Sequence, residues 1–481
     1  MKSRDYVFFY LNGKPYEVRG SDVFLPLADY LRVRARLTGT KIVCAEGDCG
    51  ACSVLRGTSG SSEALEPINS CIATVGILDG YHLITVDALV ENETLSPIQK
   101  QMIECNGGQC GFCTPGFVVA LTGLAEKKCK EGCKSLSVQD VKNALTGNLC
   151  RCTGYQPIID AGVGIDLKSY SSISKRFITN ESEKALHLSK KSPIELTANG
   201  RKWFSPTSVS EVSKLLKKYP GSRILSGGTD LGVQINKGKT LPEIVIDLHL
   251  VRELHEISIK KNRVRIGARV SLSTLRRKLE TESKDFSSFL DIFASPQIKN
   301  MASIVGNLAN ASPIGDTLPF LLVSETTVFV ASSGGKRSIS IDKLWTGYRQ
   351  LSLKKNEWIT HIEFSIPGKS DFVKLYKSSQ RKDLDISAVN AAFWVSMNSS
   401  KKSANTSRLA FGGVGATPIR ALKTEKALNS QSLVDFNKQE LLDTLQKDIS
   451  PLSDLRGSSE FRRVLGHQFL RDYLDQVRKL Q

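Results

Sequence analysis

The chain has 481 residues, of which 40% are hydrophobic and 24% charged, and it carries a formal net charge of +18. This length predicts about three domains, and the composition is typical of a globular protein rather than a disordered or fibrous one. The chain contains no run of about 18 apolar residues, as a membrane span would require, and its N-terminus, MKSRDYVFFYLNGKPYEVRG, lacks the order of a signal peptide. We therefore expect a cytoplasmic protein. Its scattered basic residues favour a solvated surface, or docking to an acidic partner subunit, over binding to nucleic acid.

The first third of the chain divides into a strand-rich region and a helical region. Residues 1–90 contain several short strand-like runs and one helical interval. The Asn12-Gly13 turn between two of these runs predicts a hairpin. Residues 91–165 are expected to be helical, because helix-start signals such as SPIQ and SVQD recur through them.

The rest of the chain predicts a mixture of strands and helices. Residues 166–195 are rich in Ser and Lys and are expected to form a linker. Residues 196–370 alternate predicted strands and helices, with SRILSGGTDLGVQI at 222–235 among the strand candidates. Residues 371–481 begin with strands and end in helices. The predicted fold class is a multi-domain α+β protein.

A first set of cysteines has the spacing of an iron–sulfur site. All eleven cysteines fall between positions 44 and 152, which in a reducing compartment indicates metal binding rather than a disulfide framework. Cys44, Cys49 and Cys52, with Cys71 downstream, match the plant-type [2Fe–2S] pattern. Zinc is the alternative, although it usually takes spaced pairs of ligands rather than three cysteines in one tight loop.

A second set combines a C-x2-C pair, Cys110 and Cys113, with a C-x-C pair, Cys150 and Cys152. These spacings leave zinc and a second [2Fe–2S] cluster open. A predicted helix start follows each pair, and helix N-termini stabilise thiolates, which favours the cluster. Three further cysteines are expected to be packing or surface residues: Cys105, Cys129 and Cys133.

Three motifs, CAEGDCGACSV, GQCGFCTPGF and NLCRCTGYQPI, together resemble the iron–sulfur half of the xanthine dehydrogenase and aldehyde oxidase family of molybdenum hydroxylases. The resemblance implies a β-grasp ferredoxin-like domain at 1–90 and a four-helix [2Fe–2S] domain at 91–165. It also selects two [2Fe–2S] clusters over zinc. The implied iron ligands are Cys44, Cys49, Cys52, Cys71, Cys110, Cys113, Cys150 and Cys152.

Two further stretches bear on a flavin site. RILSGGTDLGV at 223–233 places glycines after a predicted strand, where backbone N–H groups are able to cradle a phosphate, although an ordinary turn is the alternative. NMASIVGNLANASPIGDTLPFL at 300–321 supplies small and polar residues that allow close approach to a bulky ligand. Together they resemble the FAD domain of the same family, which implies an α+β FAD-binding domain at 196–370 and an α+β C-terminal flavoprotein domain at 371–481.

The resemblance also implies individual FAD contacts. The loop at 224–231 would wrap the pyrophosphate through its backbone, and Ser303, Asn307 and Asp316 would hold the ribityl, phosphate and adenosine parts. Phe293 and Ile359 match further cofactor-contacting positions but are equally explained as core residues. The predicted set is Ile224, Leu225, Ser226, Gly227, Gly228, Thr229, Asp230, Leu231, Phe293, Ser303, Asn307, Asp316, Ile359 and Lys377.

The resemblance does not extend to the molybdenum–pterin domains of the family. It therefore implies the small subunit of a xanthine dehydrogenase-type hydroxylase with a separate large molybdenum subunit, expected as a heterotetramer of two small and two large subunits. Electrons from purine hydroxylation on the partner are expected to pass through the helical-domain cluster, the ferredoxin-like cluster and FAD to NAD+. The alternatives are an aldehyde or aromatic hydroxylase with another acceptor, and a zinc-stabilised module without enzymatic activity. No residue of this chain is predicted to be catalytic.

Overall fold

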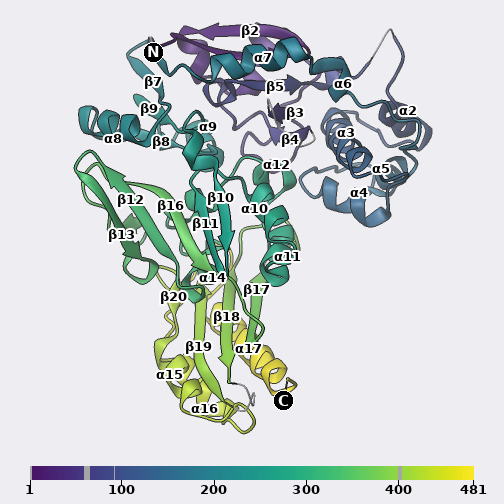
Figure 1. The fold of residues 1–481 in the computed structure, drawn as a ribbon. Coiled ribbons are helices and arrows are strands. Elements are labelled where there is room, and N and C mark those ends of the chain that lie inside the picture. The colour runs from purple at the N-terminus through teal and green to yellow at the C-terminus, as the bar shows by residue number, and fades with distance from the viewer. Residues whose placement is uncertain (1–2, 59–64, 91–92, 399–402, 481) are drawn as a thin grey trace. The chain divides into compact units, whose positions relative to one another are not determined.

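The computed structural model describes residues 3–58, 65–90, 93–398 and 403–480. The chain forms two compact units (Figure 1). The first consists of residues 1–252 and 294–302, and the second of residues 253–293 and 303–481. In the part of the chain that the structure describes, no helix combines the length and the apolar character needed to cross a bilayer.

The first unit begins with a five-stranded mixed sheet in the order β2-β1-β5-β3-β4, in which β1 pairs antiparallel with β2 and parallel with β5. The predicted hairpin is present: Leu11 pairs with Lys14 across Asn12 and Gly13, whose φ angles are 52° and 79°. The sheet and the helical interval share one hydrophobic core, which confirms the β-grasp prediction. The elements are β1 (Tyr6–Leu11), β2 (Lys14–Arg19), α1 (Leu27–Asp29), the π-helical turn η2 (Tyr30–Arg34), β3 (Ser53–Thr58), β4 (Glu66–Asn69) and β5 (Tyr81–Ile84).

Four helices follow, as predicted: α2 (Pro97–Glu104), α3 (Thr114–Lys130), α4 (Val138–Leu145) and α5 (Gln156–Val163). Capping boxes start two of them, because the side chain of Ser96 accepts from Gln99 N and that of Ser137 from Asp140 N. The central helix α3 is buried over most of its length and packs against the other helices in a single hydrophobic core (Figure 1).

The segment predicted as a linker contains two helices, α6 (Ser174–Phe177) and α7 (Asn180–Ser189). Glu126, buried on α3, accepts hydrogen bonds from Tyr170 Oη at 2.9 Å and from Ile173 N at 2.8 Å. Nε2 of His82 on β5 lies 2.8 Å from Glu183 Oε1 on α7. The segment is therefore held against both preceding domains by buried and partly buried polar contacts.

The first unit also includes the start of the predicted FAD domain, a four-stranded sheet in the order β6-β7-β9-β8. The strand predicted across residues 222–235 is confined to its first part. After Leu225 the chain turns at Ser226–Gly228 and enters helix α9, because Gly228 adopts a φ of 75° that reverses the chain. The elements are β6 (Ile194–Ala198), β7 (Arg201–Ser205), α8 (Val209–Lys218), β8 (Arg223–Leu225), α9 (Thr229–Asn236) and β9 (Ile244–Asp247).

The second unit contains a five-stranded antiparallel sheet in the order β10-β11-β16-β12-β13 and a four-stranded sheet, β17-β18-β19-β20. The first sheet comprises β10 (Ile257–Lys260), β11 (Arg263–Gly267), β12 (Thr327–Ser332), β13 (Gly335–Ser340) and β16 (Trp358–Ser365). Its helices are α10 (Leu272–Lys278), α11 (Lys284–Ile292), α13 (Ile304–Ala309) and α14 (Leu318–Val323).

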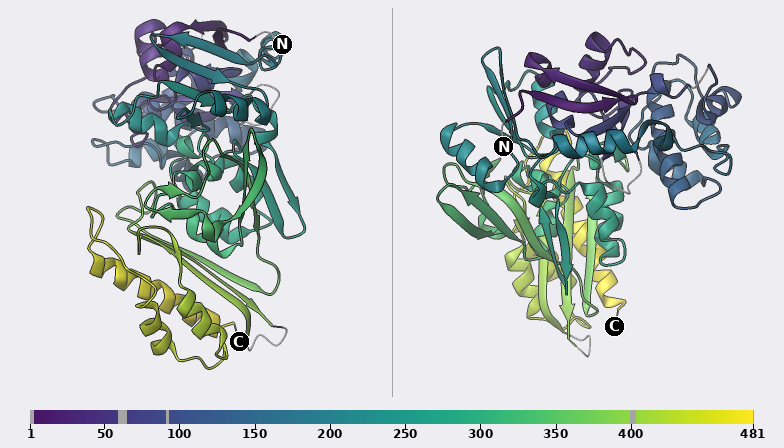
Figure 2. Two further views of the ribbon diagram at one scale, coloured as in Figure 1. Left: turned by 90° about the vertical axis from the view of Figure 1, so that its left-hand side faces the viewer. Right: turned by 45° about the horizontal axis from the view of Figure 1, so that its top comes forward.

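The C-terminal sheet comprises β17 (Asp371–Ser378), β18 (Val389–Met397), β19 (Ala404–Gly412) and β20 (Ile419–Arg420). It is followed by α15 (Leu422–Asn429), α16 (Lys438–Leu445) and α17 (Ser459–Arg478). Figure 2 shows the yellow C-terminal helix α17 along this sheet, where Leu470, Tyr473 and Val477 are buried in a shared core. The predicted order of strands followed by helices is confirmed.

Candidate cofactor sites

The first cysteine set lies in the loop between η2 and β3 and directly after β4. Cys52 and Cys71 are buried, whereas Cys44 and Cys49 are half-buried. The thiol of Cys44 interacts with those of Cys49 and Cys71, which lowers the pKa of Cys44 and raises those of its two partners. The contact with Cys71 likewise lowers the pKa of Cys52. The four predicted ligands are thus brought together.

The donor set fits a two-iron cluster, which takes two thiolates per iron. Cys44 with Cys49, and Cys52 with Cys71, form two such pairs of neighbouring thiols. Over the described ranges, no three His, Cys, Asp or Glu side chains surround a position for a single metal ion.

One residue that holds this loop had no signal in the sequence. Asn236, the last residue of α9, donates from Nδ2 to Ala45 O and to Cys71 O, both at 2.8 Å. Cys49 N also donates to Cys44 Sγ at 3.4 Å. Backbone donors of this kind help to set the potential of a sulfur-ligated cluster.

The second cysteine set lies at the starts of two helices. Cys113 is the N-cap of α3, and Cys150 and Cys152 precede α5. The thiols pair across the two motifs, Cys113 with Cys150 and Cys110 with Cys152. Burial, together with the contact to Cys150, raises the pKa of Cys113 to about 12. This crossed pairing also supplies two thiols per iron.

The second set is open to solvent. Cys110 and Cys152 are exposed, and the side chain of Phe112 between the first two cysteines is 49% exposed. Cys150 is anchored by Thr153 Oγ1, 3.2 Å from its Sγ, and by a hydrogen bond from its backbone N–H to Tyr155 Oη at 3.0 Å. The Cys150 side of the site is therefore held by residues of the same domain, whereas the side with Cys110 and Cys152 is exposed to solvent.

The two cysteine loops are in direct backbone contact. Leu149 N, next to Cys150, donates to the carbonyl of Cys49 at 3.0 Å. The loops approach so closely that a Cβ added to Gly50 would collide with the carbonyl of Gly147. This hydrogen bond connects Cys49, a predicted ligand of the first set, to Leu149, the residue before Cys150 of the second set.

The predicted pyrophosphate loop of the first unit has the geometry of a close-approach turn. Ile224 and Leu225 lie in β8, Ser226–Gly228 form the turn, and Thr229, Asp230 and Leu231 begin α9. An added Cβ at Gly227 would collide with the backbone of Met301. The loop therefore presents backbone N–H groups at a helix N-terminus, as an anion-binding loop does.

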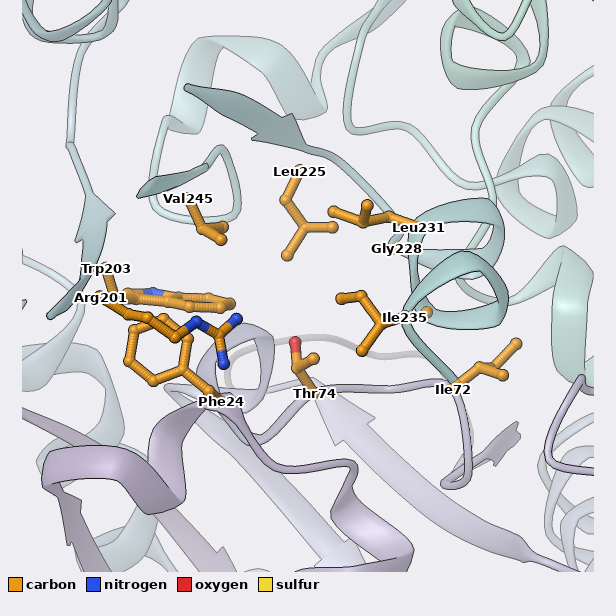
Figure 3. Close-up of a pocket in the computed structure, with 11 residues that line it drawn as sticks. Phe24, Ile72, Thr74, Arg201, Trp203, Leu225, Gly228, Leu231, Ile235 and Val245 are labelled. Carbon is orange, nitrogen blue, oxygen red and sulfur yellow. The ribbon is translucent and has the colours of Figure 1, made fainter. Parts of the chain in front are cut away.

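A small cavity lies beneath this loop, inside the first unit (Figure 3). Leu231 and Ile235 of α9 face Trp203 and Phe24 across it. Its volume of about 10 Å3 is room for about one water molecule. The cavity is a packing gap and not the FAD site.

In the second unit, two predicted FAD contacts form a buried ion pair. Lys377 Nζ lies 2.6 Å from Asp316 Oδ2, and the two side chains are only 2% and 5% exposed. The other carboxylate oxygen of Asp316 accepts from Ser387 Oγ at 2.6 Å and from Asn390 Nδ2 at 3.0 Å. Every polar atom of the Asp316 side chain is thus engaged.

The remaining predicted contacts of the second unit fall on α11, α13 and β16. Ser303 caps α13 by accepting from Gly306 N at 3.0 Å, and Asn307 Oδ1 accepts from Thr317 Oγ1 at 2.8 Å. Phe293 ends α11 and is half-buried. Ile359 is buried within β16.

A buried charge network near the flavin loop was not predicted. His249, two residues after β9, lies with Nδ1 against Asp247 and with Nε2 3.8 Å from Asp79 Oδ2. Arg4 Nη1 donates to Asp79 Oδ1 at 2.8 Å. Burial opposes the charge on His249, but the Asp247 and Asp79 carboxylates outweigh it and raise its pKa to about 9. The network joins the β-grasp sheet to the strand beside the flavin loop.

This pKa predicts that stability falls at alkaline pH. Because the folded-state pKa of His249 lies above the ordinary 6.5, its contribution is complete below pH 6.5 and is lost as the pH rises to about 9. The free energy of unfolding should fall by about 3 kcal/mol across this window. Urea midpoints followed by far-UV circular dichroism at pH 6.5, 7.5 and 9 measure the effect. His249→Gln should flatten the dependence, and an equal slope in both proteins would contradict the assignment.

Known families match the chain over three consecutive stretches. Residues 85–162 match the [2Fe-2S] binding domain, residues 196–367 the FAD binding domain in molybdopterin dehydrogenase, and residues 374–477 the CO dehydrogenase flavoprotein C-terminal domain. These matches confirm the predicted cofactor classes at the level of domains.

Curated relatives cover nearly the whole chain. The xanthine dehydrogenase of Emericella nidulans is 29% identical over 98% of it, and that of Oryza sativa subsp. japonica is 30% identical over 96%. In both cases the chain spans only 39% of the relative's length.

Solved structures share the fold of a little more than half of the chain. The Cu,Mo-CO dehydrogenase in its cyanide-inactivated form gives a TM-score of 0.54 at 23% identity, over 58% of this chain and 97% of the other. Quinoline 2-oxidoreductase from Pseudomonas putida 86 gives 0.52 at 24% identity, over 57% and 95%. The three matched domains, in this order, fit the iron–sulfur and FAD-binding part of the molybdenum hydroxylase family.

Proposed function

We propose that this chain is the electron-transfer subunit of a xanthine dehydrogenase-type hydroxylase. It would accept electrons from a purine oxidised on a separate molybdenum subunit and deliver them to NAD+. The observation that carries the proposal is the contact between the two cysteine loops, where Leu149 N donates to Cys49 O. A backbone hydrogen bond joins the two thiol sets, and the chain continues into an FAD-binding domain. This arrangement suits the transfer of single electrons towards a flavin.

The chain's own residues have distinct parts in this proposal. The two thiol sets would each hold one [2Fe–2S] cluster, and helix N-termini and backbone donors would stabilise the thiolates. Backbone N–H groups at 226–228 would hold the pyrophosphate of FAD, and Asp316 and Lys377 would contact the rest of the cofactor. When bound, the clusters carry single electrons and the flavin exchanges between one- and two-electron steps.

The open edge of the second cysteine set is the proposed docking face for the molybdenum subunit. Cys110, Cys152 and Phe112 are exposed there, and Tyr155 is 36% exposed. An apolar ring beside two exposed thiols requires cover to exclude solvent from the cluster. The net charge of +18 favours an acidic partner, and the proposed assembly has two small and two large subunits.

Purine as the substrate is supported by the relatives, whose names are xanthine dehydrogenase. The proposed compartment is the cytoplasm, because none of the eleven cysteines, all of which lie in described residues, is paired in a disulfide, as expected of a reducing compartment.

Co-expression with a large molybdenum subunit tests the proposal. The purified complex should be brown, with about four irons and one FAD per small subunit, and hypoxanthine should drive NAD+ reduction. A colourless, iron-free chain prepared under non-oxidising conditions would overturn the electron-transfer role. Oxidation of hypoxanthine coupled only to oxygen would overturn NAD+ as acceptor and leave the electron-transfer role intact.

A further inference from the structure

The segment Ala294–Ala302, hereafter the bridge segment, lies within the FAD-binding sequence but belongs to the compact unit built mainly from residues 1–252. It contains the short helix α12 (Pro296–Lys299), capped by Ser295, whose side chain accepts from Ile298 N. Gln297 on this helix is completely buried. A completely buried amide can bond only within the protein; Gln297 does so through Nε2, and its Oε1 accepts no hydrogen bond from the described residues.

The amide of Gln297 joins the two cysteine loops. Its Nε2 donates to Asn148 Oδ1 at 2.9 Å and to Ser53 Oγ at 3.3 Å. Both of these residues donate in turn to Gly50 O, Ser53 Oγ at 2.7 Å and Asn148 Nδ2 at 3.3 Å. The four groups form a closed hydrogen-bonded ring. Gly50 lies within the first cysteine set, and Asn148 lies two residues before Cys150 of the second.

The rest of the bridge segment contacts the predicted pyrophosphate loop and the apolar residues around Cys52 and Cys71. The backbone of Met301 and Ala302 lies against Gly227, where no side chain fits, so it backs the predicted pyrophosphate loop. Ile298 is packed in the apolar shell of Cys52 and Cys71. One short segment therefore contacts both cysteine sites and the flavin loop.

The segment is also secured to the β-grasp domain independently of Gln297. Asn300 Nδ2 donates to Pro67 O at 2.8 Å, and Asn300 O accepts from Arg56 Nη2 at 2.7 Å. These bonds should hold α12 near β4 when Gln297 is replaced. A substitution at Gln297 therefore perturbs the ring without detaching the segment.

We propose that the bridge segment, through Gln297, is the positioning element that fixes the two iron–sulfur sites and the flavin loop relative to one another. This inference rests on the proposed electron-transfer function. Gln297 touches no predicted ligand atom and acts through Asn148 and Gly50. Because the ring is closed and buried, its bonds reinforce one another and restrict the two cysteine loops to one spacing.

Gln297→Met in the full chain tests this role, because methionine keeps the length of the side chain and removes both donors. Each cluster should keep its iron and its g-values, while the magnetic interaction between the two reduced clusters in EPR changes. Transfer between the clusters should slow measurably, because the spacing of the two cysteine loops is no longer fixed. The matched control is Gln139→Met on the same chain, since Gln139 is exposed and bonds only across its own helix to Asn143.

A second variant disturbs the hydrogen-bonded ring through Gly147 instead of Gln297. A Cβ at Gly147 would collide with the Gln297 amide and would lie 2.7 Å from Ser295 Cβ. Gly147→Ala should therefore displace Gln297 and reproduce the EPR change. In Gly147→Ala/Gln297→Met the two effects should be non-additive, because both act on one ring. Gly415→Ala, where an added Cβ meets only atoms at 3.5 Å or beyond, controls for the alanine itself.

The outcomes separate this inference from the proposed function. Unchanged cluster interaction and transfer rate in Gln297→Met would overturn the positioning role and leave the electron-transfer function standing. Loss of iron from either site in that variant would make Gln297 a ligand-loop folding residue and would also overturn the role. A wild-type chain with no cluster signal would instead refute the proposed function.

Discussion

Replacing Cys150 with Ser is expected to abolish one of two [2Fe–2S] EPR signals and to leave the other unchanged. Cys150 pairs with Cys113 at the start of α3, and its sulfur is held by Thr153. A serine hydroxyl is much less acidic than a cysteine thiol, and its oxygen is a harder ligand than a thiolate sulfur. Iron should fall from about four to about two per chain, and flavin reduction by hypoxanthine should fall at least about 100-fold, because even outer-shell changes at metal sites cost about 10–100-fold.

The matched control is Cys129→Ser. Cys129 packs against the same helical core but is not a predicted ligand. It should leave both signals and the iron content unchanged. Loss of both signals or of neither in Cys150→Ser would contradict two separate clusters, and zinc in place of iron in the wild-type chain would restore the zinc alternative.

Local signals predicted most of the secondary structure near the sites. The Asn12-Gly13 turn produces the β1-β2 hairpin because both residues adopt positive φ. Ser96 and Ser137 start helices because their side chains satisfy backbone N–H groups within the first turn. Such features depend on a few neighbouring residues, and their physical cause is visible in a single sequence.

The strand candidate at 222–235 shows where local reasoning fails. Its residues are apolar enough for a strand, but the turn at 226–228 redirects the chain into α9 after only three strand residues. The close approach of the Met301 backbone to Gly227 comes from a segment more than seventy positions away. Periodicity within a window cannot register a contact of that kind.

The cysteine ligands were predicted, but the contacts between the two cysteine sets were not. Spacing left zinc open at the second cysteine set, and it gave no indication that thiols pair across the motifs, Cys110 with Cys152 and Cys113 with Cys150. Gln297 had no signal at all, because an isolated glutamine is typical of a surface residue. Its importance arises only when tertiary packing buries it between the two cysteine loops.

Lys377→Met is expected to destabilise the second unit by about 3–5 kcal/mol, because it leaves the buried Asp316 carboxylate without its cation. Ser387 and Asn390 still donate to Asp316, but neutral donors do not replace a charge at 2.6 Å. The urea midpoint should fall accordingly, and FAD should be lost on gel filtration. Lys438→Met is the control, because the Lys438–Asp475 pair is partly exposed and should contribute at most about 1 kcal/mol.

The double variant Asp316→Asn/Lys377→Met separates folding from cofactor binding. With both charges removed, no uncompensated carboxylate remains, and stability should recover to within about 1–2 kcal/mol of the wild type. If Asp316 and Lys377 contact FAD as proposed, the double variant should fold but bind FAD less tightly than the wild type. Its Kd, measured by flavin fluorescence, should be at least about tenfold higher. Full recovery of both stability and FAD affinity would show that the pair only supports the fold. In that case the flavin contacts of this unit would have to come from other residues, with Ser303 and Asn307 the next to replace.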